Sequence, residues 1–180
     1  AKPVITCPKG LALGGGAEVT MAGNASVAAS ESFIGLVEVG VGLIPGGTGT
    51  VQLMRNIFGE YAGDKDFDPF PFIRKAFLTI ATAQVSTSGA QHAGSVGFLK
   101  PRDVISLAGD QLLDTAKTMA SAMAEAGFRP PRPATFRLPG KSGFATIDMQ
   151  LYSFVQDNQA SEHDRLIGQK LTTILTNKDT

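Results

Sequence analysis

The stretch LALGGGAEVT, residues 11–20, places three consecutive glycines two positions before Glu18. Further along the chain, IGLVEVGVGLIPGG, residues 34–47, again surrounds a single acid, Glu38, with apolar residues and glycines. Glycine lets the backbone approach a ligand closely and adopt conformations closed to other residues. A glutamate among apolar residues is uncommon unless it is solvated or paired. The repeated combination marks both segments as candidate parts of a functional site.

The composition restricts the classes of function. Among 180 residues, 16 Lys and Arg balance 16 Asp and Glu, so no long-range field attracts nucleic acid or an anionic membrane. Charged residues make up 18% of the chain, below the roughly 25% usual in soluble domains, which predicts a homo-oligomer. No apolar run approaches the roughly 20 residues of a membrane span.

Cysteine and histidine are too scarce for a disulfide or a metal centre. Cys7 is the one cysteine, which fits a reducing compartment and predicts a cytoplasmic protein. His92 and His163 are the only histidines, and with a single cysteine they cannot form a recognisable zinc constellation. We therefore expect no metal.

The first third of the chain reads as short strands and helices. Residues 3–7, 26–30 and 32–36 are short and β-rich, and a polar turn at Glu31 separates the last two. A helix is expected over residues 17–23 after the glycines. A second helix over 51–59 would be capped by Thr48 or Thr50 and closed by Gly59.

The rest of the chain is predicted to be mostly helical. Asp68 and Pro69 start a helix over 70–84, and Ser86 or Ser88 opens a short helix over 89–98. The further helices are expected over Val104–Ala126, Phe144–Asp157 and Glu162–Thr176, the last with a capping-box-like start at Ser161 and Asp164. Residues 127–143 hold four prolines and form an extended connector, whose basic residues are either a phosphate site or a solvated surface.

Neither glycine cluster has the pattern of a nucleotide site. GLIPGGTGT, residues 42–50, lacks the lysine of a Walker loop. Gly14 and Gly16 are followed by Val19 where a dinucleotide fingerprint requires its third glycine. Nucleotide hydrolysis and NAD binding by this chain are therefore not expected.

Gly15 stands where a helix begins, so its backbone N–H is a candidate donor to an oxyanion. The first N–H groups of a helix have no partner within the helix, and the helix dipole adds positive potential there. Such a donor stabilises charge on a thioester oxygen. The alternative is that the three glycines merely allow tight packing of strand against helix.

Three blocks of the sequence resemble consecutive blocks of the enoyl-CoA hydratase/isomerase (crotonase) superfamily. They are KPVITCPKGLALGGGAEVTMAG (2–23), FIGLVEVGVGLIPGGTGT (33–50) and AFLTIATAQVSTSGAQHAGSVGFL (76–99). The tail, with EAGFRPP and SEHDRLIGQKL, further resembles multifunctional fatty-acid oxidation proteins with a 3-hydroxyacyl-CoA dehydrogenase region. The resemblance implies an α/β fold: the carboxyl-side half of a crotonase (ClpP-like) ββα spiral, followed by packing or oligomerisation helices.

The resemblance also assigns residues. Glu18 and Glu38 match the two catalytic glutamates of hydratases, and Gly15 matches the residue whose N–H forms half of the oxyanion hole. Gly46 matches a glycine whose backbone helps to place the attacking water. Water addition across a double bond needs a base for the water and an acid for the carbon. We expect Glu18 to be the base and Glu38 the acid, with the two titrating as a coupled pair.

The implied function is hydration of trans-2-enoyl-CoA in fatty-acid β-oxidation, with acyl-CoA as the substrate and no cofactor. NAD would serve only the upstream dehydrogenase region of a parent protein. In the family the second oxyanion N–H precedes the strand at KPV, so we expect a fragment that is poorly active alone. The expected boundaries are 1–127 for the crotonase-like core and 128–180 for the connector and final helices. The alternatives are a Δ3,Δ2-enoyl-CoA isomerase and a non-catalytic assembly or docking module.

Overall fold

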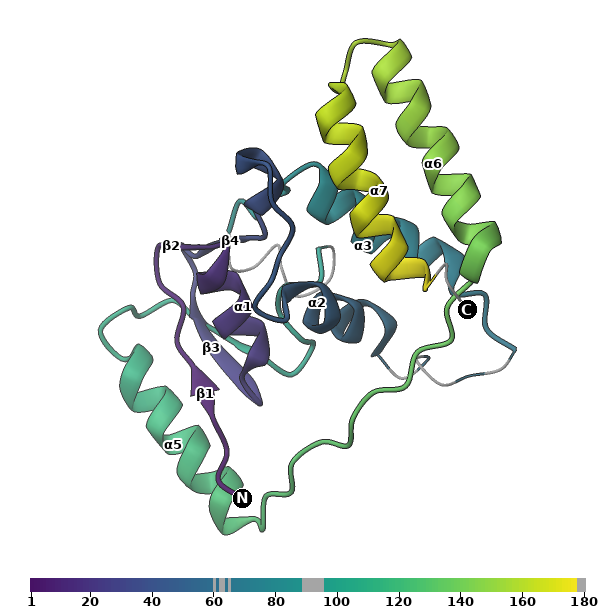
Figure 1. The fold of residues 1–180 in the computed structure, drawn as a ribbon. Helices are drawn as coiled ribbons and strands as arrows, with labels where there is room; N and C mark the ends of the chain where they lie inside the picture. The colour runs from purple at the N-terminus through teal and green to yellow at the C-terminus, as the bar shows by residue number, and fades with distance from the viewer. Residues whose placement is uncertain (60, 62–63, 65, 89–95, 178–180) are drawn as a thin grey trace.

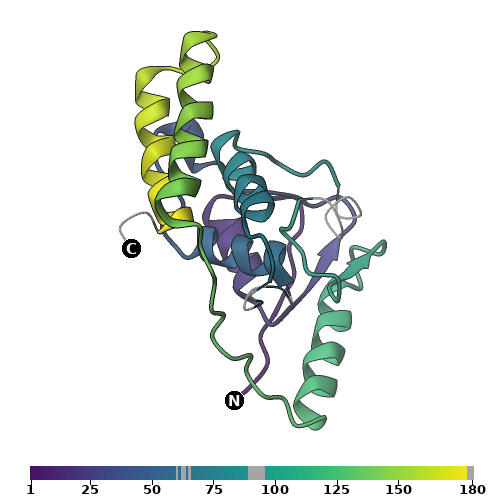
Figure 2. The ribbon, with the colours of Figure 1, turned by 90° about the vertical axis from the view of Figure 1, so that its right-hand side faces the viewer.

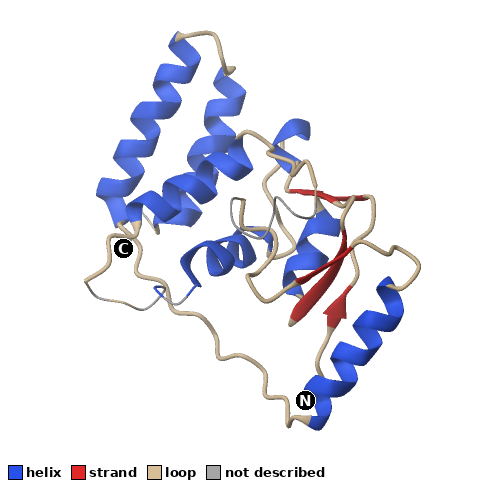
Figure 3. Ribbon diagram, turned by 180° about the vertical axis from the view of Figure 1, so that it is seen from behind, coloured by secondary structure: helices blue, strands red, loops and turns tan. Residues whose placement is uncertain are grey.

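A computed structural model describes residues 1–59, 61, 64, 66–88 and 96–177. Two small parallel sheets lie at its centre (Figure 3). One sheet has the strand order β1-β3-β5, from β1 (Ile5–Thr6), β3 (Ala25–Ala29) and β5 (Val104–Ser106). The other pairs β2 (Leu11–Leu13) with β4 (Phe33–Gly35).

Helix α1 (Gly15–Ala22) connects β2 to β3, and the strand pairs on either side of it are parallel. Parallel neighbours need such a crossover, because a tight hairpin can join only antiparallel strands. The register places Ile5 opposite Ala25 in one sheet and Leu13 opposite Gly35 in the other. The strands predicted over 3–7 and 26–30 thus pair in parallel as β1 and β3.

Strand β3 is buried along its whole length because both of its faces are covered. Successive strand residues point to opposite faces. Val27 and Ala29 pack with Leu112 of α5 (Leu112–Glu125), whereas Ala28 belongs to the main core. The continuous apolar reading of ASVAA is typical of a strand in the middle of a parallel sheet.

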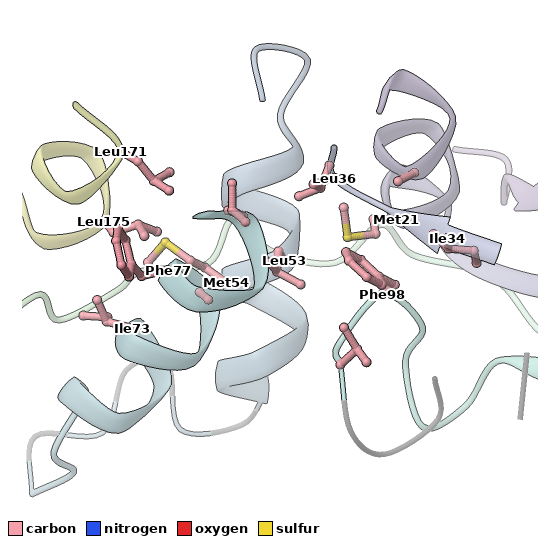
Figure 4. Packing of buried hydrophobic residues seen from close by; sticks show 14 of the residues in the cluster. Met21, Ile34, Leu36, Leu53, Met54, Ile73, Phe77, Phe98, Leu171 and Leu175 are labelled. Carbon is pink, nitrogen blue, oxygen red and sulfur yellow. The ribbon is translucent and has the colours of Figure 1, made fainter. Parts of the chain in front are cut away.

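The main core lies between the sheets and a group of helices. These are α1, α2 (Gly49–Phe58), α3 (Phe70–Ala81), α6 (Gly140–Gln156) and α7 (Glu162–Thr176). In Figure 4, Phe77 of α3 lies among Met54, Leu171 and Leu175, while Phe98 packs beside Met21 and Ile34. All of these side chains are at most 4% exposed, so the residues that surround α3 form one continuous apolar interior.

Helices α6 (Gly140–Gln156) and α7 form a pair that packs on α3 through α7. Figures 1 and 2 show this pair at one end of the molecule and α5 at the other. Residues 127–139 run between them without helix or strand, as predicted for the proline-rich connector. No helix in the described ranges has both the length and the apolar character needed to cross a membrane.

The helix predicted over Val104–Ala126 is wrong in its first part. Residues 104–106 are strand β5, paired in parallel with residues 27–29 of β3, and the helix begins only at Leu112. Ser30 donates its N–H to the carbonyl of Ser106 at 2.9 Å, which extends the pairing by one residue. The apolar spacing of this segment fits a helix, but the backbone bonds to β3 determine its structure.

Other predictions were closer. The strands over 26–30 and 32–36 are confirmed as β3 and β4, and α3 follows Asp68 and Pro69, with Asp68 accepting the N–H of Phe70. Strand β2 was not predicted, α1 begins two residues earlier and α6 four residues earlier than expected. The short helix predicted over 89–98, with His92, falls largely outside the described residues.

The capping predictions had mixed outcomes. Ser161 and Asp164 form the expected capping box at the start of α7. Gly59 closes α2 with a positive φ of 53°. Thr48 occupies the N-cap position of α2, but it makes no side-chain capping bond, and its φ of 83° is left-handed. The threonine cap is therefore wrong, and another side chain takes that role.

Candidate active site

Glu18 supplies the missing cap of α2. It lies in the first turn of α1 and is 9% exposed. Its Oε1 accepts the backbone N–H groups of Gly47 and Gly49, both at 2.8 Å. A carboxylate at the amino end of a helix satisfies N–H groups that have no partner within the helix, and it interacts favourably with the helix dipole. The acid of the first motif is thereby bound to the glycines of the second motif.

The two glycines that bind Glu18 leave no room for a side chain. A Cβ at Gly47 would overlap Oε2 of Glu18. A Cβ at Gly49 would lie 2.8 Å from Oε1 of Glu18 and 2.8 Å from Leu36 Cδ2. Glycine is required at these two positions because only a residue without a side chain lets the backbone come this close to the carboxylate. This requirement explains the glycines of the segment GGTG.

Glu38 begins the short 3-10 helix η1 (Glu38–Val41) and is half-buried. Its Oε2 is buried and has no hydrogen-bond partner among the described residues. Burial is the main cause that raises the pKa of Glu38, and the charge of Glu18 raises it further, against backbone hydrogen bonds that lower it. Glu38 therefore favours its protonated form more than an exposed glutamate does.

The turn before α1 brings Glu38 to the glycine triplet. Gly14 has a φ of 54° and donates its N–H to the carbonyl of Gly35 at 2.8 Å. The Cβ position of Gly14 lies 3.5 Å from Oε1 of Glu38. Because β2 and β4 pair with Leu13 opposite Gly35, the residues that follow each strand meet at one edge. The two sequence motifs are joined there.

Gly15 is the first residue of α1, and the space in front of it is open. A Cβ at Gly15 would meet no heavy atom within 4 Å. Its N–H has no backbone or side-chain acceptor among the described residues. This N–H therefore remains available to an oxygen atom that approaches beside Glu38. An N–H without a partner at a helix start is a candidate donor to an oxyanion.

Gly46 lies in the loop between η1 and α2, directly before Gly47, and is exposed. Its Cβ position is free within 4 Å. The structure thus brings together Glu18, Glu38 and Gly15. Gly46 directly precedes Gly47, whose N–H donates to Glu18. The roles of Gly47 and Gly49 were missed in the sequence, although the glycine-rich segment GGTG was visible.

An apolar hollow of about 450 Å³ adjoins η1. Val39 and Gly40 line it on the side of Glu38, and Leu151, Phe154 and Leu171 line it from α6 and α7. In the part of the chain that the structure describes, no three His, Cys, Asp or Glu side chains gather as a metal site would need. The candidate site therefore consists of two carboxylates and a free helix-start N–H, and the hollow lies next to it, since Glu18, Glu38 and Gly15 are not among the residues that line the hollow.

The chain is similar to several known proteins. The chain is 40% identical over 175 residues to a Bacillus subtilis protein named "Probable 3-hydroxyacyl-CoA dehydrogenase", covering 97% of this chain and 21% of the relative. It is 34% identical over 117 residues to a peroxisomal fatty acid beta-oxidation multifunctional protein of Arabidopsis thaliana, covering 64% of this chain and 14% of that protein. The chain thus spans about a fifth or less of the length of these two relatives. No protein-family model matches it.

The fold comparison agrees. An enoyl-CoA hydratase from Mycobacterium marinum superposes with a TM-score of 0.52 at 23% identity, covering 96% of this chain and 56% of that structure. An identity at this level establishes the fold alone. Together these comparisons show that the chain has the crotonase fold and is similar in sequence to multifunctional proteins of fatty-acid oxidation.

Proposed function

We propose that this chain carries the reaction centre for hydration of trans-2-enoyl-CoA to 3-hydroxyacyl-CoA. The observation that supports it most is that two carboxyl groups in different surroundings lie in one site. Glu18 accepts hydrogen bonds from two backbone N–H groups. Glu38 has a raised pKa, and its buried Oε2 has no hydrogen-bond partner among the described residues. Two carboxyl groups whose surroundings differ suit an acid and a base acting on one substrate.

In the proposed reaction, Glu18 accepts a proton from water while the water oxygen bonds to C3 of the enoyl thioester. The C2=C3 electron pair shifts toward the thioester, and the charge that develops on its oxygen is stabilised by the N–H of Gly15. Glu38 then gives its proton to C2. A proton passing from Glu18 to Glu38 resets the pair, which the raised pKa of the partly buried Glu38 favours.

The apolar hollow beside η1 offers space for the acyl chain. It begins at Val39 and Gly40, directly after Glu38, and extends to Leu151 and Phe154. An acyl chain would bury apolar surface there, worth about 25 cal/mol per Å². We further propose that the region works within a larger protein of fatty-acid oxidation, since relatives with such names contain a matching segment. NAD would be bound by a dehydrogenase region and not by this one.

The test is an assay of the protein with trans-2-enoyl-CoA in deuterated water. We expect loss of the ultraviolet absorbance of the conjugated thioester and a 3-hydroxyacyl product with one deuterium at C2. The matched substrate is the 3-enoyl-CoA of the same chain length. Rapid conversion of that compound with no hydration would instead favour the isomerase. Absence of both reactions, with retained binding of acyl-CoA, would favour a docking role.

A further inference from the structure

A second hollow, of about 420 Å³, lies at the opposite end of α1 from Gly15. Gly23 and Asn24, which follow α1, form one wall, and α2 forms another through Gln52, Arg55 and Asn56. Lys100, Pro101 and Arg102 close it from the segment before β5, and Pro131 closes it from the connector. The reaction centre and this hollow therefore share α1 but use its two different ends.

Three cationic side chains line this hollow, and each is held by backbone carbonyls. Lys100 Nζ donates to the carbonyls of Met21 (3.2 Å) and Gly23. Arg102 donates to the carbonyl of Asn24 at 2.8 Å, and Arg55 to that of Arg132 at 2.9 Å. The ion pairs found within the described ranges, Lys117 with Asp114 and Arg165 with Asp148, involve none of these three. Their positions are thus fixed while their charges lack a carboxylate partner.

The charge of Asp103 offsets part of this positive charge. Asp103 accepts the N–H groups of Ser26 (2.9 Å) and Lys100 (2.7 Å) through its two oxygens. Burial lowers the pKa of Lys100, and the charges of Arg102 and Arg55 lower it further, against the charge of Asp103 that raises it. The cations therefore repel one another across the hollow. Such a group loses this repulsion when an anion binds between its members.

We infer that this hollow binds a small anion bearing phosphate groups. A guanidinium group can donate two parallel hydrogen bonds to the oxygens of one phosphate, and the ammonium of a lysine adds a positive point charge. Asn24 accepts the N–H of Val4 with Oδ1, so its Nδ2 remains for a further oxygen. The volume falls within the roughly 300–1,000 Å³ of small-molecule sites. The connector contributes only Pro131 to the lining, and Arg55 donates to the backbone carbonyl of the next residue, Arg132.

Calorimetric titration of the protein with inorganic pyrophosphate, at about 0.15 M salt to screen diffuse attraction, tests this site. We expect one saturable site. Arg55→Gln and Arg102→Gln should each weaken it about tenfold or more, since a hydrogen bond to a charged group contributes about 1.5–3 kcal/mol. Arg74→Gln on α3, the same change on an exposed side chain outside the hollow, should leave binding unchanged.

Two results would overturn the inference: no saturable binding, or equal weakening by Arg74→Gln and the two hollow variants. Arg102 is exposed, so Arg102→Gln remains informative if Arg55→Gln does not fold. A separate competition experiment identifies the source of the phosphate groups. Competition between pyrophosphate and CoA would assign the hollow to the nucleotide of the substrate, and simultaneous binding would assign it to another metabolite. Glu18→Gln should still bind pyrophosphate, so this result does not depend on the hydratase proposal.

Discussion

Glu18 Oε1 lies 2.8 Å from the backbone nitrogen of Gly49, so the buried acid of α1 caps the amino end of α2. Each of these two helices of the candidate site is thereby positioned by the other. A residue proposed as the catalytic base is also part of the fold. Its substitutions must therefore separate a loss of proton transfer from a loss of the cap.

Glu18→Gln keeps an oxygen that can accept from Gly47 and Gly49, but it removes the base. Hydration should fall by roughly 10²- to 10⁴-fold, while the urea midpoint changes little. Glu18→Ala removes the acceptor as well and should lower the free energy of unfolding by about 1–3 kcal/mol. Enzyme assay and urea denaturation of both variants check this. Equal stability of the two variants would contradict the capping role.

Glu38→Gln should change how stability depends on pH. Because the pKa of Glu38 is raised from its ordinary value of 4.5, the folded state favours the protonated carboxyl. Its favourable contribution is fully present below pH 4.5 and is lost as the pH rises through the folded pKa. At neutral pH the variant should therefore be more stable than the wild type, with the difference vanishing in acid. Thermal melts from pH 4 to 8 measure it, and a constant difference would refute it.

Gly47→Ala places a Cβ on Oε2 of Glu18 and should displace that carboxylate. Overpacking of this kind costs about 1–3 kcal/mol, so both stability and hydration should fall. Gly46→Ala is the control for folding, since its Cβ position is free within 4 Å. Denaturation curves of the two variants give the comparison. A Gly47→Ala protein as stable as the Gly46→Ala protein would exclude the close approach that the structure describes.

Gly15→Val should reduce turnover and leave folding intact. The space around its Cβ is open, and valine is no worse than glycine as a helix residue, so the melting temperature should stay near that of the wild type. The side chain would block the approach of the thioester oxygen to the N–H, with an expected loss of about 10²- to 10³-fold. Parallel losses of activity and melting temperature would support the packing explanation of the glycine triplet instead.

Ser161→Ala should weaken α7 by about 1 kcal/mol through loss of its cap. The Ser161 hydroxyl and N–H lower the pKa of Asp164, so this contribution is present above pH 3.8 and is lost as the pH falls through the folded pKa. Urea denaturation at pH 7 and pH 3 should show the difference shrinking in acid. Ser153→Ala, an exposed serine within α6, should show no comparable cost.

Local features of the sequence were predictable where neighbouring residues determine them. The capping box at Ser161 and Asp164, the start of α3 after Asp68, and the extended connector depend on contacts between residues close in the chain. The two acids of the candidate site were predictable as well. A glutamate among glycines and apolar residues can be recognised from the residue and its neighbours in the sequence alone.

Contacts between distant residues decided the rest. Residues 104–106 have an apolar spacing that fits a helix, yet parallel hydrogen bonds to β3, across about 75 intervening residues, make them a strand. No local pattern contains those partners. The same reason explains why Thr48 was predicted to cap α2, since the actual acceptor, Glu18, lies 31 residues from Gly49.

The sequence by itself determined which residues are candidates for the chemistry: the two glutamates and the glycines beside them, because these are local properties of the chain. Only the tertiary structure decided how they meet. Pairing of β2 with β4 places Glu38 next to Gly14, and the N–H groups of Gly47 and Gly49 hold Glu18. The charge on Lys100, Arg55 and Arg102 likewise gathers in one hollow only after folding, since hydrogen bonds to distant carbonyls fix each side chain.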